Sequence, residues 1–285
     1  MFEFFRSLVP MIAPVFVISM MLHVGLTQKP SEIIEYLKNR SFVLKMLLAN
    51  FVLAPLLMIL ILRFTSFDPA LEAGLLVFAL CAGAPFLIKL TQTAQHSIAL
   101  GAAVMMLLMV VTIVYVPVAL PLFLSGLSVD AWAVAKSLLL QMLLPVIAGM
   151  LVVPYLPGLT RKAQPLTGWL SNILLYVLTG ATLIAYSPNM FGILRTGALF
   201  VGLAFVVGAF GIGYLMGAGK AHLEDVGGLG TAQRNTGAAV IIAIQNFSDP
   251  NELVIITLTN TLGVVLLLFI AKRLSRDHKV RIETV

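Results

Sequence analysis

The sequence predicts an all-α integral membrane protein that crosses the bilayer about nine times. Hydrophobic residues make up 60% of the 285 residues and charged residues only 11%, and the mean hydropathy is +1.04. A soluble domain usually has about 25% charged residues, so this chain has too few to cover a surface that faces water. In addition, apolar segments of about 20 residues, the length that spans a hydrocarbon core, recur along the whole chain.

Nine such segments are separated by short loops that contain turn-forming residues. The stretch before the first segment lacks a basic region and a cleavage pattern, so we expect a retained helix and not a signal peptide. We expect residues 1–285 to form a single transmembrane domain, and a monomer is compatible with the sequence. The segments cover residues 7–25, 43–63, 71–91, 97–124, 131–155, 168–187, 194–217, 225–246 and 251–272.

The basic residues gather in alternate loops, so the net charge of +6 follows from membrane topology and needs no nucleic-acid partner. We expect the basic side, which includes a tail at 273–285, to be cytoplasmic, and the N-terminus of a nine-span chain to be outside the cell (inner or plasma) membrane. The basic side holds Lys29, Lys38, Arg40, Lys45, Arg161, Lys162, Lys220, Lys272, Arg273, Arg276, Lys279 and Arg281, and the other side holds Arg6, Arg63, Lys136 and Arg195.

The third and eighth segments are interrupted by residues that weaken helices. The third contains the run Cys81-Ala-Gly-Ala-Pro85, and the eighth opens with a glycine-rich run from Gly227 to Gly237. They lie five segments apart, which fits two inverted repeats (1–124 and 131–272) of which the first lacks its opening helix. Broken helices at matching places in two halves indicate the midplane binding site of a transporter. The helix-break residues are Gly83, Pro85, Gly230 and Gly237.

Arg234 lies about eight residues into the eighth segment, so we expect its guanidinium near the middle of the membrane. A charge there costs at least about 2.5–3.5 kcal/mol and is a functional-site hypothesis by default. An arginine fork can hold a carboxylate, phosphate or sulfonate through two hydrogen bonds. The alternative is a structural arginine that caps the interrupted helix.

Lys89 and His23 are the other candidate charges. Lys89 follows the Pro85 break by one helical turn, so it either points back to the crossing or extends to the lipid headgroups. A buried lysine loses its proton readily, which makes Lys89 a candidate for proton coupling. His23, at the inner end of the first segment, is either an interfacial residue with satisfied hydrogen bonds or a second proton carrier.

Amides and hydroxyls within the apolar segments complete the predicted substrate site. They sit in the two interrupted segments and, for one residue, in the second segment. The predicted substrate-binding set is Arg234, Lys89, Asn235, Gln233, Thr236, Thr91 and Asn50.

The sequence contains no pattern typical of an enzyme, a metal site or a bound cofactor. Every acidic residue lies in a loop, a tail or a span end, so a carboxylate-centred sodium cage or proton relay has no obvious ligands. Cys81 is the only cysteine, which excludes an internal disulfide. A secondary transporter is therefore the leading class, and an anion channel is the second.

The chain resembles the bile acid:sodium symporter superfamily. The resemblance rests on the run from Gly25 to Ser31, on the Cys81-to-Pro85 break and on Gly230-Thr-Ala-Gln-Arg-Asn-Thr-Gly237 followed by Asn246-Phe247. It implies panel and core subdomains, inverted repeats with two discontinuous crossing helices, and sodium-coupled uptake of organic anions. Loss of the opening helix also occurs in the family.

The sodium-site positions of that family are replaced in this chain. The family's glutamate and glutamine on the second broken helix read Gly230 and Arg234, and only Asn235 agrees. On the first broken helix a Ser-Asn pair reads Leu87-Ile88, directly before Lys89, and the hydroxyl-rich next helix is represented by Met105 to Met109. A cation at these positions would repel sodium by about 4 kcal/mol at roughly 4 Å and an effective dielectric near 20.

We therefore expect a secondary transporter that moves a small organic anion of the carboxylate type by alternating access without sodium. Arg234, with Lys89, would replace the ions that organise the crossing. Such a carrier would work as a uniporter, an exchanger or a proton-coupled transporter. The alternatives are a sodium-coupled symporter of bile-acid type and, in another class, an anion channel.

Overall fold

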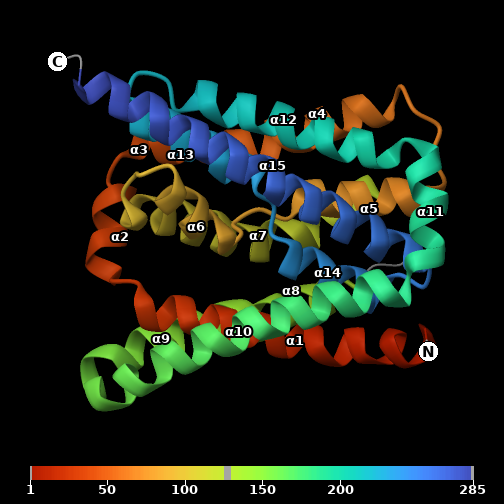
Figure 1. Ribbon diagram of the computed structural model, residues 1–285, viewed down its shortest axis with the longest axis horizontal. Helices are drawn as coiled ribbons and strands as arrows, with labels where there is room; N and C mark the ends of the chain where they lie inside the picture. The colour runs from red at the N-terminus through yellow and green to blue at the C-terminus, as the bar shows by residue number, and fades with distance from the viewer. Residues whose placement is uncertain (1, 125–129, 284–285) are drawn as a thin grey trace.

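The computed structural model describes residues 2–124 and 130–283, and within these ranges the secondary structure is helical throughout (Figure 1). Six helices are long and apolar enough to span a membrane. The all-helical, multi-span class predicted from composition is therefore confirmed. These spans are α1 (Phe2–Thr27), Arg40–Leu62, α7 (Ile98–Phe123), Trp132–Tyr155, α12 (Ala198–Met216) and Pro250–Arg276 of α15 (Pro250–Glu283).

Two of the long spans each contain a π-helical turn that ends two residues before a proline. In the first, α3 (Arg40–Leu48) and α4 (Ala54–Leu62) are joined by Ala49–Leu53. In the second, α8 (Ala131–Leu138) and α9 (Leu144–Tyr155) are joined by Leu139–Leu143. A proline lacks the N–H that a helix interior needs, and a wider turn before it accommodates that loss without ending the span.

The three remaining predicted segments have a different structure. The third is α5 (Pro69–Leu80) and α6 (Phe86–Thr93), and the eighth is α13 (Ala221–Ala232) and α14 (Thr236–Asn246). The sixth lies within α10 (Pro157–Ala185), which begins 11 residues before the predicted boundary at 168. Proline is accepted at the first position of a helix, and α10 accordingly begins at Pro157. Short helices α2 (Pro30–Leu37) and α11 (Ser187–Thr196) connect spans.

The basic tail continues helix α15, which extends to Glu283.

The helices form two groups that meet along a seam (Figure 1). In the first group, α1 packs chiefly on α10 and α9. In the second, α12 packs on α13 and α15 packs on α5. A Cβ at Gly25 would overlap the carbonyl oxygen of Val146, so the backbones of α1 and α9 are in direct contact. Small residues at such contacts let membrane helices approach closely.

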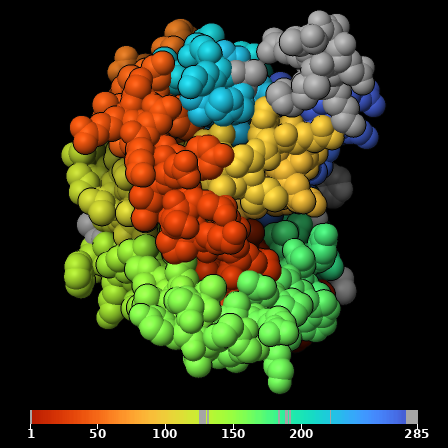
Figure 2. Space-filling model, turned by 90° about the vertical axis from the view of Figure 1, so that its left-hand side faces the viewer, coloured from red at the N-terminus to blue at the C-terminus, as the bar shows by residue number. Residues whose placement is uncertain are grey.

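The end of the molecule that carries α2, α6 and the turn between α9 and α10 is the predicted basic side. Figure 2 shows this end, with a recess in the surface between α6 (yellow) and α10 (green). The seam between the two groups is therefore accessible from this end.

Gly25→Ala is expected to destabilise the protein by about 1–3 kcal/mol, because the added methyl overpacks the contact between α1 and α9. The matched control is Gly180→Ala in α10, where a Cβ meets nothing within 4 Å. The midpoint of thermal unfolding in detergent measures both. An unchanged midpoint for Gly25→Ala would contradict the close packing of these helices.

Candidate functional site

The breaks in the two interrupted helices touch each other. The backbone N–H of Asn235 donates to the carbonyl of Cys81 at 2.9 Å, and its side-chain Nδ2 donates to the carbonyl of Gly83 at 3.0 Å. Thr112 of α7 holds the first break from the other side, since its hydroxyl bonds both the N–H and the carbonyl of Ala82, at 3.1 and 3.0 Å. Other protein groups thus form hydrogen bonds with the non-helical backbone at the breaks, as is required within a membrane where water is absent.

Local sequence explains why the chain breaks here. Gly83 has φ +80°, and a Cβ at this position would overlap the backbone of α7 at Met109, so only glycine fits. Asn235 caps α14 by accepting a hydrogen bond from the N–H of Ala238 at 3.1 Å. Pro85 directly precedes the first residue of α6.

Arg234 lies between the C-terminal ends of α5 and α13, and its side chain is completely buried. One terminal nitrogen donates to Oδ1 of Asn50 at 2.8 Å and to the carbonyl of Thr231 at 3.1 Å. The other donates to the carbonyl of Ala79. Both half-helices therefore end on the guanidinium, where a positive charge is favourable for the helix dipole.

Asn50 connects this cation to α13. Its Nδ2 donates to the hydroxyl of Thr231 and to the carbonyl of Met46, both at 3.0 Å, while its Oδ1 accepts from Arg234. Within the described ranges Arg234 forms no ion pair, so carbonyl and amide dipoles alone balance its charge. The Nε of Arg234 has no hydrogen-bond partner among these residues.

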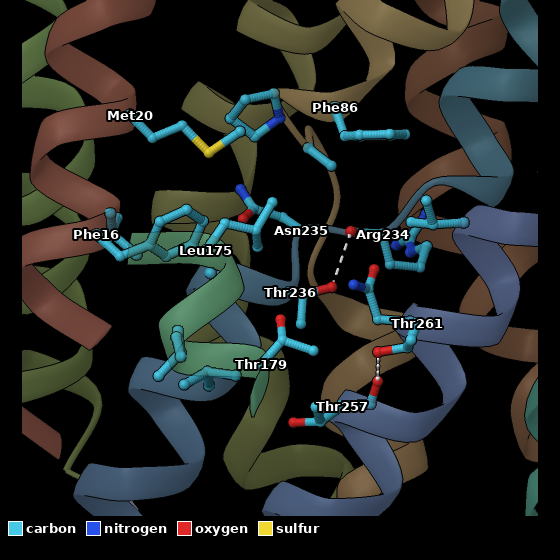
Figure 3. A pocket seen from close by; sticks show the side chains of 18 of the residues that line it. Phe16, Met20, Phe86, Leu175, Thr179, Arg234, Asn235, Thr236, Thr257 and Thr261 are labelled. Carbon is cyan, nitrogen blue, oxygen red and sulfur yellow. Dashed lines mark hydrogen bonds between the residues drawn. The ribbon is translucent and has the colours of Figure 1, made fainter. Parts of the chain in front are cut away.

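A cavity of about 400 Å³ lies in the seam on the other side of the crossing. Figure 3 shows it between Phe16 of α1, Leu175 of α10 and Thr261 of α15, with Asn235 at its centre and Arg234 on the side away from Phe16. Its wall is mainly apolar, as in most small-molecule sites. The polar residues of the lining are Gln233, Asn235, Thr236, Thr179, Thr182, Thr257, Asn260 and Thr261, together with the buried Arg234.

Four members of the predicted substrate-binding set line this cavity, namely Gln233, Arg234, Asn235 and Thr236. Asn50 is completely buried beside Arg234 and does not line it. Thr91 is buried too, donates to the carbonyl of Leu87 at 2.8 Å and packs on Gly101 of α7.

Lys89 is exposed on α6 and is not part of the cavity lining. His23 is half-buried between α1 and α10, with its Nδ1 3.1 Å from the carbonyl oxygen of Gln164 and 3.2 Å from the hydroxyl of Thr167. His23 is also absent from the cavity lining.

The glycines of the eighth segment do not form its break. Gly230 lies inside α13, where a Cβ would be 2.9 Å from Val104 of α7, and Gly237 lies in the first turn of α14 beside the cavity. The interruption is at Gln233–Asn235. There the Arg234 guanidinium donates to the carbonyl of Ala79, and the Asn235 amide donates to the carbonyl of Gly83 in the other interrupted segment.

Sequence reasoning missed one further polar contact. His96, in the loop after α6, lies 2.7 Å from a carboxylate oxygen of Asp225 near the start of α13, and both side chains are buried. This contact joins the ends of the two interrupted segments that lie on the basic side. The two residues are 129 positions apart in the sequence, so no local pattern reveals the pair.

Asn50→Leu is expected to cost about 1.5–3 kcal/mol of stability, since it removes a buried hydrogen bond to a charged group and the only side chain that pairs with the guanidinium among the described residues. Asn50→Asp is expected to destabilise less, because a carboxylate accepts the same hydrogen bond. The control is Asn246→Leu, which removes only one hydrogen bond to the carbonyl of Ile242. Thermal unfolding in detergent ranks the variants, and equal losses for Asn50→Leu and Asn246→Leu would contradict the proposed pairing.

Comparison with known proteins agrees with this architecture. The model of the Sodium Bile acid symporter family matches residues 14–191, which is more than half of the chain and includes the first break but not the second. A search among curated proteins finds no match. The family match confirms the resemblance predicted from the sequence. Members of this family are transporters and not enzymes. The chain belongs to the Sodium Bile acid symporter family of secondary transporters.

Proposed function

We propose that this chain moves a small organic anion of the carboxylate type by alternating access and does so without sodium. The observation that carries the proposal is the bonding of Arg234. Its guanidinium donates hydrogen bonds to the amide oxygen of Asn50 and to the carbonyl oxygens of Ala79 and Thr231. Oxygens of these kinds are the ligands that hard cations use in proteins. A covalently attached cation thus fills the place where the two broken helices meet.

The same arrangement disfavours a mobile cation. Sodium at about 4 Å from the guanidinium would be repelled by about 4 kcal/mol at an effective dielectric near 20. No acid offsets this repulsion at the position where the sodium-coupled pattern has a glutamate. That position is Gly230 in this chain, and it packs against Val104. Lys89 is exposed and adds no charge to the buried crossing.

The anion is proposed to bind at the N-terminal ends of α6 and α14. Both helices begin at the crossing, at Phe86 and Thr236, and both residues line the cavity. Helix N-termini carry partial positive charge and unpaired N–H groups, and discontinuous transporter helices use them for anionic substrates. Gln233, Asn235 and Thr236 supply the side-chain contacts, and Arg234 contributes its positive field from behind the crossing.

Transport is proposed to involve movement of one helix group against the other along the seam. The α1, α8–α9 and α10 group corresponds to the panel, and the remaining spans correspond to the core with inverted repeats at 1–124 and 131–272. The six long spans, the two broken ones and α10 then give nine crossings, with the basic C-terminal side cytoplasmic. Neither His23 nor Lys89 lines the cavity, which favours uniport or exchange over proton coupling through them.

Transport by the purified protein in liposomes is expected to proceed at the same rate with a sodium gradient and with an equal potassium gradient. A panel of radiolabelled monocarboxylates, including a bile acid, identifies the substrate. Strict dependence on sodium would overturn the proposal in favour of a sodium-coupled symporter. Ion conductance in planar bilayers, at rates that no rocking carrier reaches, would indicate a channel.

Arg234→Gln is expected to abolish transport and to lower thermal stability, because the half-helices α5 and α13 lose the cation that joins them. Removing the charge also opens the site to other cations, so this variant is expected to be more stable in NaCl than in equimolar KCl, unlike the native protein. Arg273→Gln, which changes an exposed arginine of α15, is the control. A native protein that sodium itself stabilises would contradict the assigned role of Arg234.

A further inference from the structure

A second, smaller pocket lies in the same seam near the N-terminal end of α1. Its volume is about 160 Å³. Its wall is formed by the start of α1, by Tyr186 after α10 and by the turn between α14 and α15. The lining includes Arg6, Val9, Tyr186, Ser248, Asp249 and Leu253.

The two pockets lie in series along the same helices. On α1 the small pocket is lined at Arg6, Val9 and Pro10, and the large cavity starts at Ala13. On α15 the small pocket is lined at Leu253, and the large cavity starts at Thr257. Each step is three or four residues, which is about one helical turn of 5.4 Å.

A thin apolar layer separates the two pockets. Val9, Ala13, Ala243 and Leu253 are all buried and belong to one apolar cluster of the described residues. They come from α1, α14 and α15, which are the elements that border the seam. The layer therefore closes the large cavity toward the N-terminal end of α1, while the recess in Figure 2 lies at the opposite end.

Arg6 places a positive charge on the wall of the small pocket. Its Nε donates to the carbonyl of Ala185 at 3.3 Å, and its guanidinium carbon lies 5.4 Å from the centre of the Tyr186 ring. No acid among the described residues pairs with Arg6 within 4.0 Å. The Asp249 carboxylate on the same wall accepts from the N–H of Asn251 at 2.8 Å, so the N-terminus of α15 offsets part of its charge.

We propose that this pocket is an outer vestibule in which Arg6 holds the carboxylate or sulfonate group of an anion before the apolar layer parts. The vestibule is too small for a whole substrate of the size that the central cavity admits, so it receives the charged group alone. Its arginine is fixed by the Tyr186 ring and the Ala185 carbonyl, which leaves the terminal nitrogens for a ligand. Only the direction of passage rests on the proposed function.

Thiol labelling tests the vestibule without a known substrate. Cys81 is completely buried, so an introduced cysteine is the reactive thiol. Ser248→Cys places that thiol at an exposed position of the vestibule wall. The probes are two membrane-impermeant methanethiosulfonates of similar size, the anionic sulfonatoethyl and the cationic trimethylammonioethyl reagents, applied to the outside of intact cells.

The anionic reagent is expected to label Ser248→Cys faster than the cationic one, and Arg6→Gln is expected to lower the ratio of the two rates about tenfold. Arg6→Lys should retain most of the ratio. The matched control is Ser66→Cys, an exposed serine in the α4–α5 loop, whose ratio should not respond to Arg6→Gln. A ratio that Arg6→Gln leaves unchanged would overturn the anion site, and labelling only from the inside would overturn the outer position.

A second measurement separates this proposal from the proposed function. In liposomes, Arg6→Gln is expected to raise KM several-fold for substrate on the face that the labelling defines as outer and to leave KM on the other face unchanged. Arg195→Gln, at an exposed arginine outside both pockets, is the control. If the labelling result holds and no carboxylate is transported, the vestibule stands and the proposed function fails. An equal rise in KM on both faces would contradict the sidedness of the site.

Discussion

The burial of one arginine between the ends of two half-helices is the constraint on which the rest of the structure depends. A charge at this depth is costly, and no carboxylate of the described residues pairs with Arg234. The protein balances it with oxygens from three different spans, those of Asn50, Ala79 and Thr231. These bonds fix where α5 and α13 end, and the crossing in turn fixes where α6 and α14 begin. The cavity therefore owes its position to the cation, although the guanidinium points away from it.

Much of the fold follows from the order of apolar segments, because lipid accepts only backbone whose hydrogen bonds are satisfied within the protein. The Cys81-to-Pro85 break was predictable, since a proline closely preceded by a glycine disfavours continuation of a helix. The second break lies inside the predicted run from Gly227 to Gly237, but neither Gly230 nor Gly237 forms it, and Gly230 instead allows close packing against α7. Spacing alone does not distinguish a glycine that ends a helix from one that makes room for a neighbour.

The candidate site was only partly predictable. Gln233 to Thr236 form a polar run inside an apolar segment, and these residues do line the cavity. The partners of Arg234 could not be predicted from the sequence. Asn50 is 184 residues away along the chain, and a single asparagine in a span can have many roles. The threonines of α10 and α15 were missed for a different reason. Hydroxyls that bond the carbonyl four residues earlier are common on membrane helices, so Thr257 and Thr261 carry no signal until the cavity is seen.

The proposed replacement of sodium by a covalently attached cation has an energetic consequence for the cell. A sodium ion that binds at a crossing is released inside and transfers the energy of its gradient to the substrate, whereas a guanidinium stays with the protein through every cycle. A uniporter of this kind only relaxes the distribution of its substrate toward electrochemical equilibrium. For a monoanion, a membrane potential of about 100 mV, negative inside, is equivalent to about 2.3 kcal/mol, which favours a concentration outside roughly fiftyfold higher than inside. Under the proposed function, replacing the ion by Arg234 therefore converts an architecture associated with uptake into one suited to the release of anions that the cell produces.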